Sequence, residues 1–335
     1  MNKKIFVFYP PSKLYQRGED RSQGNVEDSS ATTMRAPNDL GYASSTLKQK
    51  NYQVKLKDYQ SENLSFDVLK SDFEKFIPDV IFMSITNATI FGDLEIISEL
   101  IKDRPNTVVI LKGALFFNPD DEMLKLLPLE NIDYLIGGES DFVLADLIDA
   151  HFDNREKIKD IRGISFKENK EWIKTDFSSW EKDLDTLVFP DRSEINNKLY
   201  IRPDTGESQA TIITSRGCPS KCIFCLTPTI SGTKLRLRSP ENIHKEILEC
   251  YEKHNIRNFF FRSDTFTIDR RWVEKLCNLI IDSNIHNKIS WVANSRVKPL
   301  QKETLVIMKK AGCWLVAFGY ESGSEESLIK IKKGC

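Results

Sequence analysis

Short apolar runs alternate with helix-like segments along the first part of this chain. Between the runs, apolar residues recur at the spacing of one helix face, as at Leu94, Ile97 and Ile101. Nearly continuous apolar strands separated by helices are typical of a parallel sheet with helices on both faces. The predicted strands are Ile5–Phe8, Tyr52–Leu56, Val80–Met83, Val108–Leu111 and Tyr134–Ile136.

Residues 1–150 are therefore predicted to form an α/β domain with a doubly wound parallel sheet of flavodoxin type. Ligands of such sheets bind beyond the carboxyl ends of the strands. Gly137-Gly138-Glu139 stands at one of these ends. Backbone amides of a Gly-Gly turn can approach a phosphate or a ring amide, which makes the turn a candidate binding site. A plain turn, with Glu139 at a helix start that favours carboxylates, explains the same residues and stays open.

The rest of the chain divides into a connector and a second α/β region. In residues 151–209, the segments Gly163–Lys167 and Trp172–Thr175 flank a polar turn and predict a hairpin, followed by an extended linker. In residues 210–335 the alternation of strand and helix returns, and each strand ends in polar residues, as in part of a β/α barrel with a site on that face. The predicted strands are Thr211–Thr214, Arg257–Arg262, Ile289–Ala293 and Cys313–Phe318.

Composition narrows the class of protein. Hydrophobic residues make up 40% of the chain and charged residues 29%, and the net charge of −1 gives no bulk electrostatic case for a nucleic acid or a membrane as partner. No apolar run approaches the roughly 18 residues of a membrane span. The seven cysteines are an odd number, and several are clustered, which favours reduced thiols and a cytoplasmic location.

Three of these cysteines, Cys218, Cys222 and Cys225, follow a predicted strand at C-x-x-x-C-x-x-C spacing. Three thiolates on one loop suit an iron–sulfur cluster in which one iron is left open for another ligand. Structural zinc is the alternative, although the nearest histidine, His244, lies on the next predicted helix. From Ser208 to Pro240 there is no acidic residue, and nearby cations ease the reduction of a negatively charged cluster. The basic residues there are Arg216, Lys221, Lys234, Arg236 and Arg238.

The cysteine loop, with Phe224 beside the third thiol, resembles the signature of radical S-adenosylmethionine (SAM) enzymes. The resemblance is closest to the subfamily with a cobalamin-binding domain, and it extends over nearly the whole chain. It implies a flavodoxin-like, cobalamin-binding-like domain over residues 1–150, a linker over 151–209 and a partial radical SAM barrel over 210–335. The supporting motifs are Pro10-Pro11, Gly137-Gly138-Glu139, Phe189-Pro190-Asp191-Arg192, Asp264-Thr265-Phe266, Asn294-Ser295-Arg296 and Gly319-Tyr320-Glu321-Ser322-Gly323-Ser324.

The resemblance also implies roles for single residues. Cys218, Cys222 and Cys225 would hold a [4Fe–4S] cluster whose open iron chelates SAM. SAM would be contacted at its methionine amine by Asp264, at its carboxylate by Arg296, at its ribose by Glu321 and Ser322, and near its adenine by Phe224. Gly137, Gly138 and Glu139 would contact cobalamin. Each of the polar residues has a structural alternative: Asp264 as a helix N-cap, Arg296 in a surface ion pair, and Glu321 and Ser322 as caps of the last helix.

Two departures from the family pattern bear on these expectations. The cobalamin motif D-x-H-x-x-G reads Asp58-Tyr59-Gln60-Ser61-Glu62-Asn63 here, and residues 1–150 contain no histidine, so cobalamin would bind without a protein imidazole. The family barrel has six βα units, whereas only four strands are predicted here. We therefore expect a barrel truncated after four strands, in a fragment of a longer protein.

The predicted function is that of a radical SAM enzyme that cleaves SAM reductively and methylates or oxidatively rearranges an unactivated carbon. Cobalamin-dependent methyl transfer and an oxidoreductase or cyclase reaction both remain open. The expected partners are a small-molecule substrate and a reductase, flavodoxin or ferredoxin as electron donor, with no nucleic acid and no membrane. The alternative is a non-catalytic two-domain protein that binds zinc or an iron–sulfur cluster in a structural or electron-carrying role.

Overall fold

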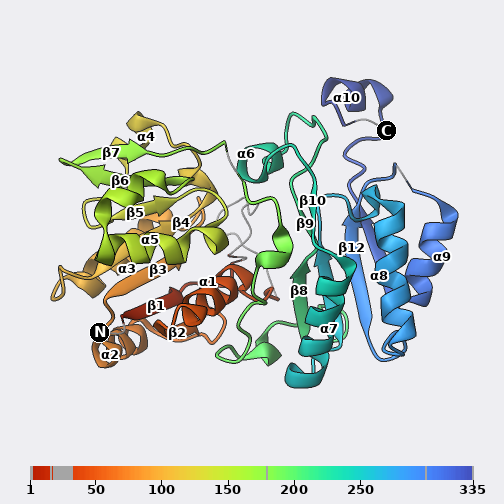
Figure 1. The fold of residues 1–335 in the computed structure, drawn as a ribbon, viewed down its shortest axis with the longest axis horizontal. Helices are drawn as coiled ribbons and strands as arrows, with labels where there is room; N and C mark the ends of the chain where they lie inside the picture. The colour runs from red at the N-terminus through yellow and green to blue at the C-terminus, as the bar shows by residue number, and fades with distance from the viewer. Residues whose placement is uncertain (1–2, 16, 18–32, 179, 299, 334–335) are drawn as a thin grey trace. The chain divides into compact units, whose positions relative to one another are not determined.

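The chain forms two compact units (Figure 1). The computed structural model describes residues 3–15, 17, 33–178, 180–298 and 300–333. The first unit holds Met1–Trp180 together with Leu187–Leu199, and the second holds Glu181–Thr186 together with Tyr200–Cys335. Residues 151–209, predicted as a linker, are thus divided between the two units.

Hydrogen bonds account for this division of the linker. Asp191 accepts a hydrogen bond of 2.6 Å from the ammonium group of Lys48, on helix α1 (Asn38–Gln49) of the first unit. Asp185 accepts one of 2.8 Å from the backbone N–H of Ser239, in the second unit. Each part of the linker is therefore fixed to a different body by its own carboxylate.

The first unit is built on a seven-stranded sheet of order β2-β1-β3-β4-β5-β6-β7. Its first five strands are parallel, as the apolar runs predict. Every residue of β3 and β4 is buried, because helices cover both faces of the sheet. The parallel strands are β1 (Lys4–Tyr9), β2 (Gln53–Asp58), β3 (Val80–Ser84), β4 (Val108–Lys112) and β5 (Tyr134–Ile136).

The helices of the first unit lie in two layers. One face of the sheet packs with α2, α3 and α4 in a single apolar cluster that includes Phe6, Phe8 and Met83. On the other face, α1 contacts β1 to β3 and also contacts α5. The helices are α2 (Phe66–Phe76), α3 (Ile90–Ile101), α4 (Asp121–Leu126) and α5 (Leu144–Asp153), with short 3-10 turns at Ala114–Phe116, Ser140–Phe142, Arg155–Asp160 and Asn197–Leu199.

The predicted hairpin is confirmed as β6 (Ile164–Glu168) and β7 (Glu171–Lys174), which pair antiparallel. It does not stand apart as a linker element. Strand β6 also pairs antiparallel with β5, so the hairpin extends the sheet of the first unit. The hairpin thereby belongs to the body that the first five strands form.

The second unit contains a four-stranded parallel sheet of order β13-β12-β11-β8, which confirms the four predicted strands. The strands are β8 (Gln209–Ile213), β11 (Asn258–Arg262), β12 (Ser290–Ser295) and β13 (Cys313–Phe318). Helices α7, α8 and α9 lie side by side and share one apolar cluster with the sheet. The helices are α6 (Thr227–Ser231), α7 (Pro240–His254), α8 (Arg270–Asp282), α9 (Lys302–Lys310) and α10 (Glu325–Lys330), with 3-10 turns at Leu184–Thr186 and Phe266–Ile268.

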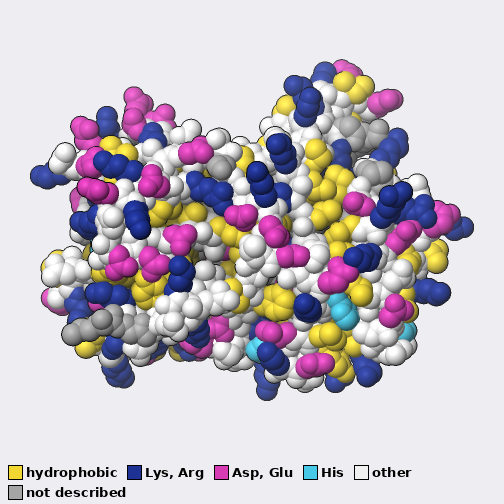
Figure 2. Space-filling view, in the orientation of Figure 1, with side chains coloured by type: hydrophobic (Ala, Val, Ile, Leu, Met, Phe, Trp, Pro, Cys, Tyr) yellow, Lys and Arg dark blue, Asp and Glu magenta, His cyan; other side chains and the backbone are white. Residues whose placement is uncertain are grey.

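The surface agrees with the nearly balanced composition. Figure 2 shows basic and acidic side chains interspersed over the face in view, as expected from a net charge of −1. None of the helices in the part of the chain that the structure describes is both long and apolar enough to cross a membrane.

The first unit carries a histidine whose pKa the fold lowers. Nδ1 of His151, on α5, lies 2.7 Å from the hydroxyl group of Tyr134, and burial together with Arg155 and Lys3 lowers the pKa of His151 from 6.5 to about 4. Between these two values the unfolded chain binds more protons than the folded chain. The contribution of neutral His151 to the free energy of unfolding is therefore complete above pH 6.5 and is lost as the pH falls towards 4.

We expect urea unfolding of the first unit to show this pH dependence. Wild-type stability should fall between pH 7 and pH 5, and His151→Gln, which keeps a neutral hydrogen-bonding side chain at every pH, should lose part of that fall. Equal pH dependence in the two proteins would contradict the lowered pKa.

Candidate functional site

The three clustered cysteines lie on a loop that begins just after the carboxyl end of β8. The short strands β9 (Ser215–Arg216) and β10 (Arg236–Leu237) pair antiparallel and close the base of this loop. Helix α6 follows Cys225 and forms the C-terminal part of the loop, before β10. The loop therefore stands at the end of the parallel sheet where ligands of β/α folds bind.

Gly217 and Cys218 fix the start of the loop. Gly217 has a φ of +78°, and a Cβ atom at this position would lie 2.2 Å from the carbonyl oxygen of Lys234. The N–H of Cys218 donates a 3.2 Å hydrogen bond to the carbonyl oxygen of Gly232. Only glycine permits this close approach of two backbone segments, so the first thiol has a defined position.

The thiols differ in exposure. Cys218 and Cys222 are each 8% exposed and Cys225 is half-buried, while Phe224 between them is 53% exposed. A hydrogen bond of 3.2 Å from the N–H of Cys225 to the carbonyl oxygen of Cys222 tightens the turn between them. The loop thus presents its sulfur atoms at a partly covered surface and leaves an aromatic ring beside them.

The donor set of this loop fits an iron–sulfur cluster. Cys218, Cys222 and Cys225 supply three thiols within eight residues, and the segment between them contains no carboxylate and no imidazole. In a [4Fe–4S] cluster each thiolate binds a different iron, so three thiols suit a cluster with one iron left open.

The other cysteines of the described chain are unlike these three. Burial raises the pKa of Cys277 and of Cys313 to about 12, so both remain protonated thiols at neutral pH. Cys250 is fully buried in the apolar cluster of the second unit. Cys250 and Cys277 are therefore core residues, and Cys313 is a partly buried residue that packs against the same cluster.

The basic residues around the loop do not all contribute a positive charge to it. Arg238 is 1% exposed and forms an ion pair of 2.6 Å with the fully buried Glu246. Arg236 donates hydrogen bonds to the backbone carbonyl groups of Glu181, at 2.7 Å, and Ser231, at 2.9 Å. The charge of Arg238 is thus compensated by Glu246, so Arg238 adds little net positive charge beside the loop.

Asp264, the predicted contact of the SAM amine, follows β11. Its Oδ1 accepts a hydrogen bond of 3.2 Å from the hydroxyl group of Thr227, at the start of α6. The alternative role as N-cap of α8 falls to Asp269, which accepts a hydrogen bond of 3.0 Å from the N–H of Trp272. Asp264 is therefore a half-buried carboxylate tied to the helix that leaves the cysteine loop.

Arg296 follows β12 and reaches the cysteine loop directly. One terminal nitrogen, Nη1, donates to the sulfur of Cys222 at 3.4 Å, and the other donates to the backbone carbonyl group of Lys333. The position therefore differs from a surface ion pair. It brings a guanidinium group, expected to bind a SAM carboxylate, into contact with one of the candidate cluster ligands.

Lys333 connects the remaining candidates. Its ammonium group forms an ion pair of 2.7 Å with Glu321 and lies 5.8 Å from the ring centre of Phe224. Phe224, Arg296 and Glu321 thus gather around Cys222 and Lys333. Lys333 could not be identified from the sequence, because its importance depends on contacts that the fold of the second unit creates.

Ser322 has a local role in the structure. Its hydroxyl oxygen accepts a hydrogen bond of 3.0 Å from the N–H of Ser324, and Ser324 is itself the N-cap of α10, accepting from Ser327. Glu321 has a φ of +63° and its carboxylate pairs with Lys333. Ser322 therefore caps the turn before α10 and not the helix itself. Glu321 has no capping role, because its carboxylate pairs with Lys333.

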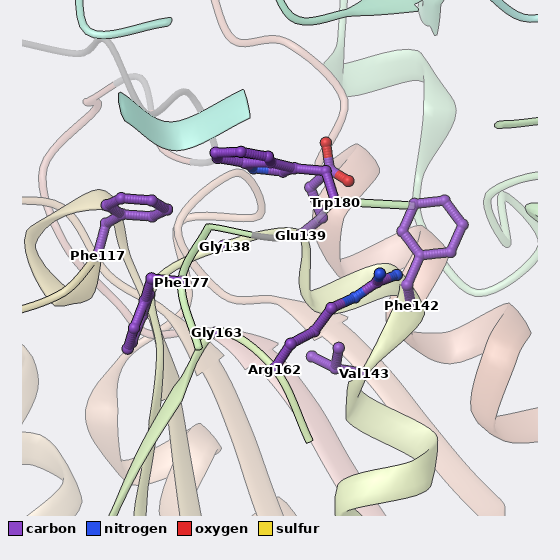
Figure 3. Close-up of a pocket in the computed structure, with 9 residues that line it drawn as sticks. All are labelled: Phe117, Gly138, Glu139, Phe142, Val143, Arg162, Gly163, Phe177 and Trp180. Atoms are coloured by element: carbon purple, nitrogen blue, oxygen red, sulfur yellow. The ribbon is translucent and has the colours of Figure 1, made fainter. Parts of the chain in front are cut away.

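A second candidate site lies in the first unit, at the turn predicted to contact cobalamin (Figure 3). A Cβ atom on Gly137 would lie 2.1 Å from the carbonyl oxygen of Phe116, so this glycine is required for packing. Gly138 and Glu139 instead line a cavity of about 20 Å³, room for about one water molecule. Four aromatic rings border the same cavity: that of Phe142, and those of Phe117, Phe177 and Trp180.

Three of these rings form a wall beside the turn. Phe117 and Trp180 stack with a centroid distance of 6.2 Å and an interplanar angle of 8°, and Phe117 meets Phe177 edge-on at 5.3 Å. In Figure 3 these rings lie on one side of the cavity, while Arg162 extends towards Phe142 on the other. The sequence singled out the glycine turn but missed the aromatic residues, which come from other loops.

Gln60 occupies the place of the histidine in the D-x-H-x-x-G pattern. Its side chain is 2% exposed, and its Nε2 donates hydrogen bonds to the hydroxyl oxygen of Ser12 at 2.8 Å and the carbonyl oxygen of Lys13 at 2.7 Å. A glutamine amide engaged in this way supplies no imidazole at that place.

Comparison with known proteins identifies a domain in the second unit. The sequence model of the radical SAM superfamily matches residues 212–335, which include the cysteine loop and the strands β11 to β13. The chain contains a radical SAM domain. The resemblance inferred from the cysteine loop and the prediction of an enzyme of the radical SAM class are thereby confirmed.

Relatives of this radical SAM protein extend the similarity into the first unit. The chain is 28% identical to an uncharacterised methyltransferase of Pyrococcus horikoshii over 300 residues, which are 89% of this chain and 63% of that protein. It is 26% identical to the anaerobic magnesium-protoporphyrin IX monomethyl ester cyclase of Cereibacter sphaeroides over 299 residues, which are 88% of this chain and 48% of that protein. The chain thus spans about half to two thirds of the length of these relatives.

Two solved structures share the fold of this radical SAM protein. The methyltransferase TsrM of Kitasatospora setae, with cobalamin and a [4Fe–4S] cluster bound, aligns with a TM-score of 0.73 at 17% identity, over 98% of this chain and 62% of that chain. The cobalamin-dependent SAM radical enzyme OxsB, with aqua-cobalamin and SAM bound, aligns with a TM-score of 0.78 at 19% identity, over 100% and 46%. At these identities the likeness establishes the fold alone, an α/β fold with parallel sheets.

Proposed function

We propose that this radical SAM protein cleaves SAM reductively and uses the resulting chemistry to methylate or oxidatively rearrange an unactivated carbon of a small-molecule substrate. The observation that carries the proposal is the loop of three thiols at the carboxyl end of β8, with Arg296 and Asp264 beside it. When bound, a [4Fe–4S] cluster would supply one electron to the SAM sulfonium, which breaks the bond from sulfur to C5′. A flavodoxin, a ferredoxin or a reductase would supply that electron.

The protein's own side chains would bind and orient SAM. Cys218, Cys222 and Cys225 would hold the cluster. Asp264, restrained by Thr227, is suited to accept hydrogen bonds from the methionine amine. Phe224 offers an exposed ring for the adenine, and Glu321, with Ser322 next to it, would accept hydrogen bonds from the ribose hydroxyl groups once its carboxylate leaves Lys333.

We further propose that the first unit binds cobalamin. The strand order β2-β1-β3-β4-β5 is the order of flavodoxin-like sheets, which bind ligands over their carboxyl ends. At these ends lie the turn Gly137–Glu139 and the aromatic wall of Phe117 and Trp180. The cavity beside them is too small to hold a corrin, so a corrin would lie over these residues. With Gln60 at this place, cobalamin would bind without an imidazole ligand from this loop. Bound cobalamin would carry a methyl group or take part in the radical step.

The exposed edge of the second sheet supports a barrel with further strands. Strand β13 is the edge strand of the four. Two consecutive residues of this strand, Trp314 and Leu315, are 45% and 41% exposed. Successive residues of a strand point to opposite faces, and parallel strands are normally buried on both. We propose that β13 pairs with an additional strand, as in a larger β/α barrel.

Anaerobic reconstitution with iron and sulfide tests the proposed function. Addition of SAM and dithionite to the brown protein should yield 5′-deoxyadenosine, and corrinoid absorbance should remain when the protein is desalted after incubation with cobalamin. A colourless protein that contains zinc would contradict the proposal and support the non-catalytic alternative.

Substitution of Trp180 tests the cobalamin part alone. Trp180→Ala removes one ring of the aromatic wall, and aromatic contacts contribute about 0.5–1.5 kcal/mol, so we expect the Kd for cobalamin to rise roughly two- to tenfold. Trp180→Phe, which keeps a flat ring, should stay close to the wild type. Equal Kd values for wild type and Trp180→Ala, measured by titration of corrinoid absorbance, would remove the aromatic wall from the site.

A further inference from the structure

Arg296 stands on a rigid support next to the cysteine loop. It follows Ser295, which is 5% exposed and whose hydroxyl group lies 2.6 Å from that of Thr267. The indole N–H of the fully buried Trp291, on the same strand, donates a 2.8 Å hydrogen bond to the carbonyl oxygen of Ala311. The strand end that carries Arg296 is therefore held by buried polar and apolar contacts. The backbone from which the Arg296 side chain extends thus has a defined position.

The guanidinium group is also oriented at its tip. Nη1 points to the sulfur of Cys222 at 3.4 Å, while the other terminal nitrogen donates to the carbonyl group of Lys333. A planar guanidinium group that is bound at one nitrogen has little freedom to turn the other. The N–H group directed at Cys222 is thus positioned before any ligand arrives.

A thiolate accepts such a hydrogen bond more strongly than a thiol, because hydrogen bonds between charged partners are the stronger ones. Hydrogen bonds to cluster sulfurs and nearby charge are among the features that set the reduction potential of iron–sulfur clusters. One-electron reduction adds a negative charge to the cluster, so a fixed cation with an N–H group on a ligand sulfur stabilises the reduced form more than the oxidised form. The potential should rise accordingly.

We propose that Arg296 is a positioning residue for the cluster, and that its N–H···S hydrogen bond to Cys222 raises the reduction potential. The inference rests on the proposed function, because it requires a cluster on the three cysteines. It differs from the role that the family resemblance implies, in which Arg296 pairs with the SAM carboxylate. The two roles separate experimentally, since one acts without SAM and the other only with it.

The test is a redox titration of the reconstituted protein with dithionite in the absence of SAM. The EPR signal of the reduced cluster measures the fraction reduced at each potential. We expect Arg296→Met to lower the ratio of reduced to oxidised cluster about tenfold at the wild-type midpoint, which corresponds to about 59 mV for one electron. Arg296→Lys, which keeps the charge, should shift the midpoint less and in the same direction. Arg271→Met, at an exposed arginine on α8, is the matched control and should leave the midpoint unchanged.

Each outcome decides between the two roles. A midpoint for Arg296→Met equal to that of the wild type overturns the inference, and a raised Kd for SAM in that variant would then assign Arg296 to the carboxylate. If Arg296→Met takes up no cluster, the midpoint of Arg296→Lys decides, and an unshifted value overturns the inference. Wild-type protein that takes up no cluster would instead overturn the proposed function itself.

Discussion

Replacing Cys222 by serine should abolish the iron–sulfur cluster, and with it all cleavage of SAM. A hydroxyl group is a poor ligand for the iron of such a cluster, and the loop has no other thiol, imidazole or carboxylate to take its place. We expect reconstituted wild-type protein to hold about four irons per chain and the Cys222→Ser variant a small fraction of that. Iron and sulfide analysis, together with the absorbance of the cluster, measures the difference.

Cys313→Ser is the matched control for this experiment. The thiol of Cys313 lies on β13 and donates a hydrogen bond of 3.5 Å to the carbonyl oxygen of Leu315, which serine can also make. This variant should retain the full iron content. Equal iron content in Cys222→Ser and wild type would show that the clustered thiols are not the ligands.

Replacing Glu246 by alanine should strongly destabilise the second unit. Glu246 is fully buried and forms the ion pair of 2.6 Å with Arg238, which also donates to the carbonyl group of Ile213 at the end of β8. Removal of one partner leaves an uncompensated buried charge, which costs about 3–5 kcal/mol. Urea unfolding monitored by tryptophan fluorescence measures the loss, and Trp272, whose indole N–H donates to the carbonyl oxygen of Arg238 at 2.7 Å, contributes to that signal.

Two further variants separate the buried charge from a general effect of mutation. The double variant Arg238→Met with Glu246→Leu removes both charges and should recover most of the lost stability. Glu274→Ala breaks the exposed pair with Arg270 on α8 and should change stability little, because solvent screens that pair. If Glu246→Ala unfolds at the same urea concentration as Glu274→Ala, the buried pair has no special role.

The sequence predicts the strands and helices well because they follow from local periodicity. Most of the five parallel strands of the first sheet and the four of the second contain an apolar run, whereas β2 alternates apolar and polar residues. The division of the linker is not readable in this way. Whether hairpin β6–β7 pairs with β5 or stands alone depends on which sheet edge is open, and the sequence of the hairpin does not encode that.

The sequence identifies the residues of the candidate site but does not show which of them contact one another. Spacing identifies Cys218, Cys222 and Cys225, and family motifs identify Arg296 and Glu321. Their partners are set by the fold: Arg296 contacts Cys222, which lies 74 residues away, and Glu321 pairs with Lys333 beyond the last helix. Runs of like charge mislead for the same reason, since Arg238 belongs to a basic stretch but is neutralised by Glu246, from the following helix.

The central claim is that the cysteine loop holds a [4Fe–4S] cluster with one iron open to SAM. EPR spectroscopy of the reconstituted, dithionite-reduced protein tests it most directly, with spectra recorded before and after addition of SAM. We expect the signal of a reduced [4Fe–4S] cluster that changes shape when SAM is added, because SAM binds the iron that lacks a cysteine ligand. A cluster signal that SAM leaves unchanged, or a protein that takes up zinc and gives no signal, would contradict the claim.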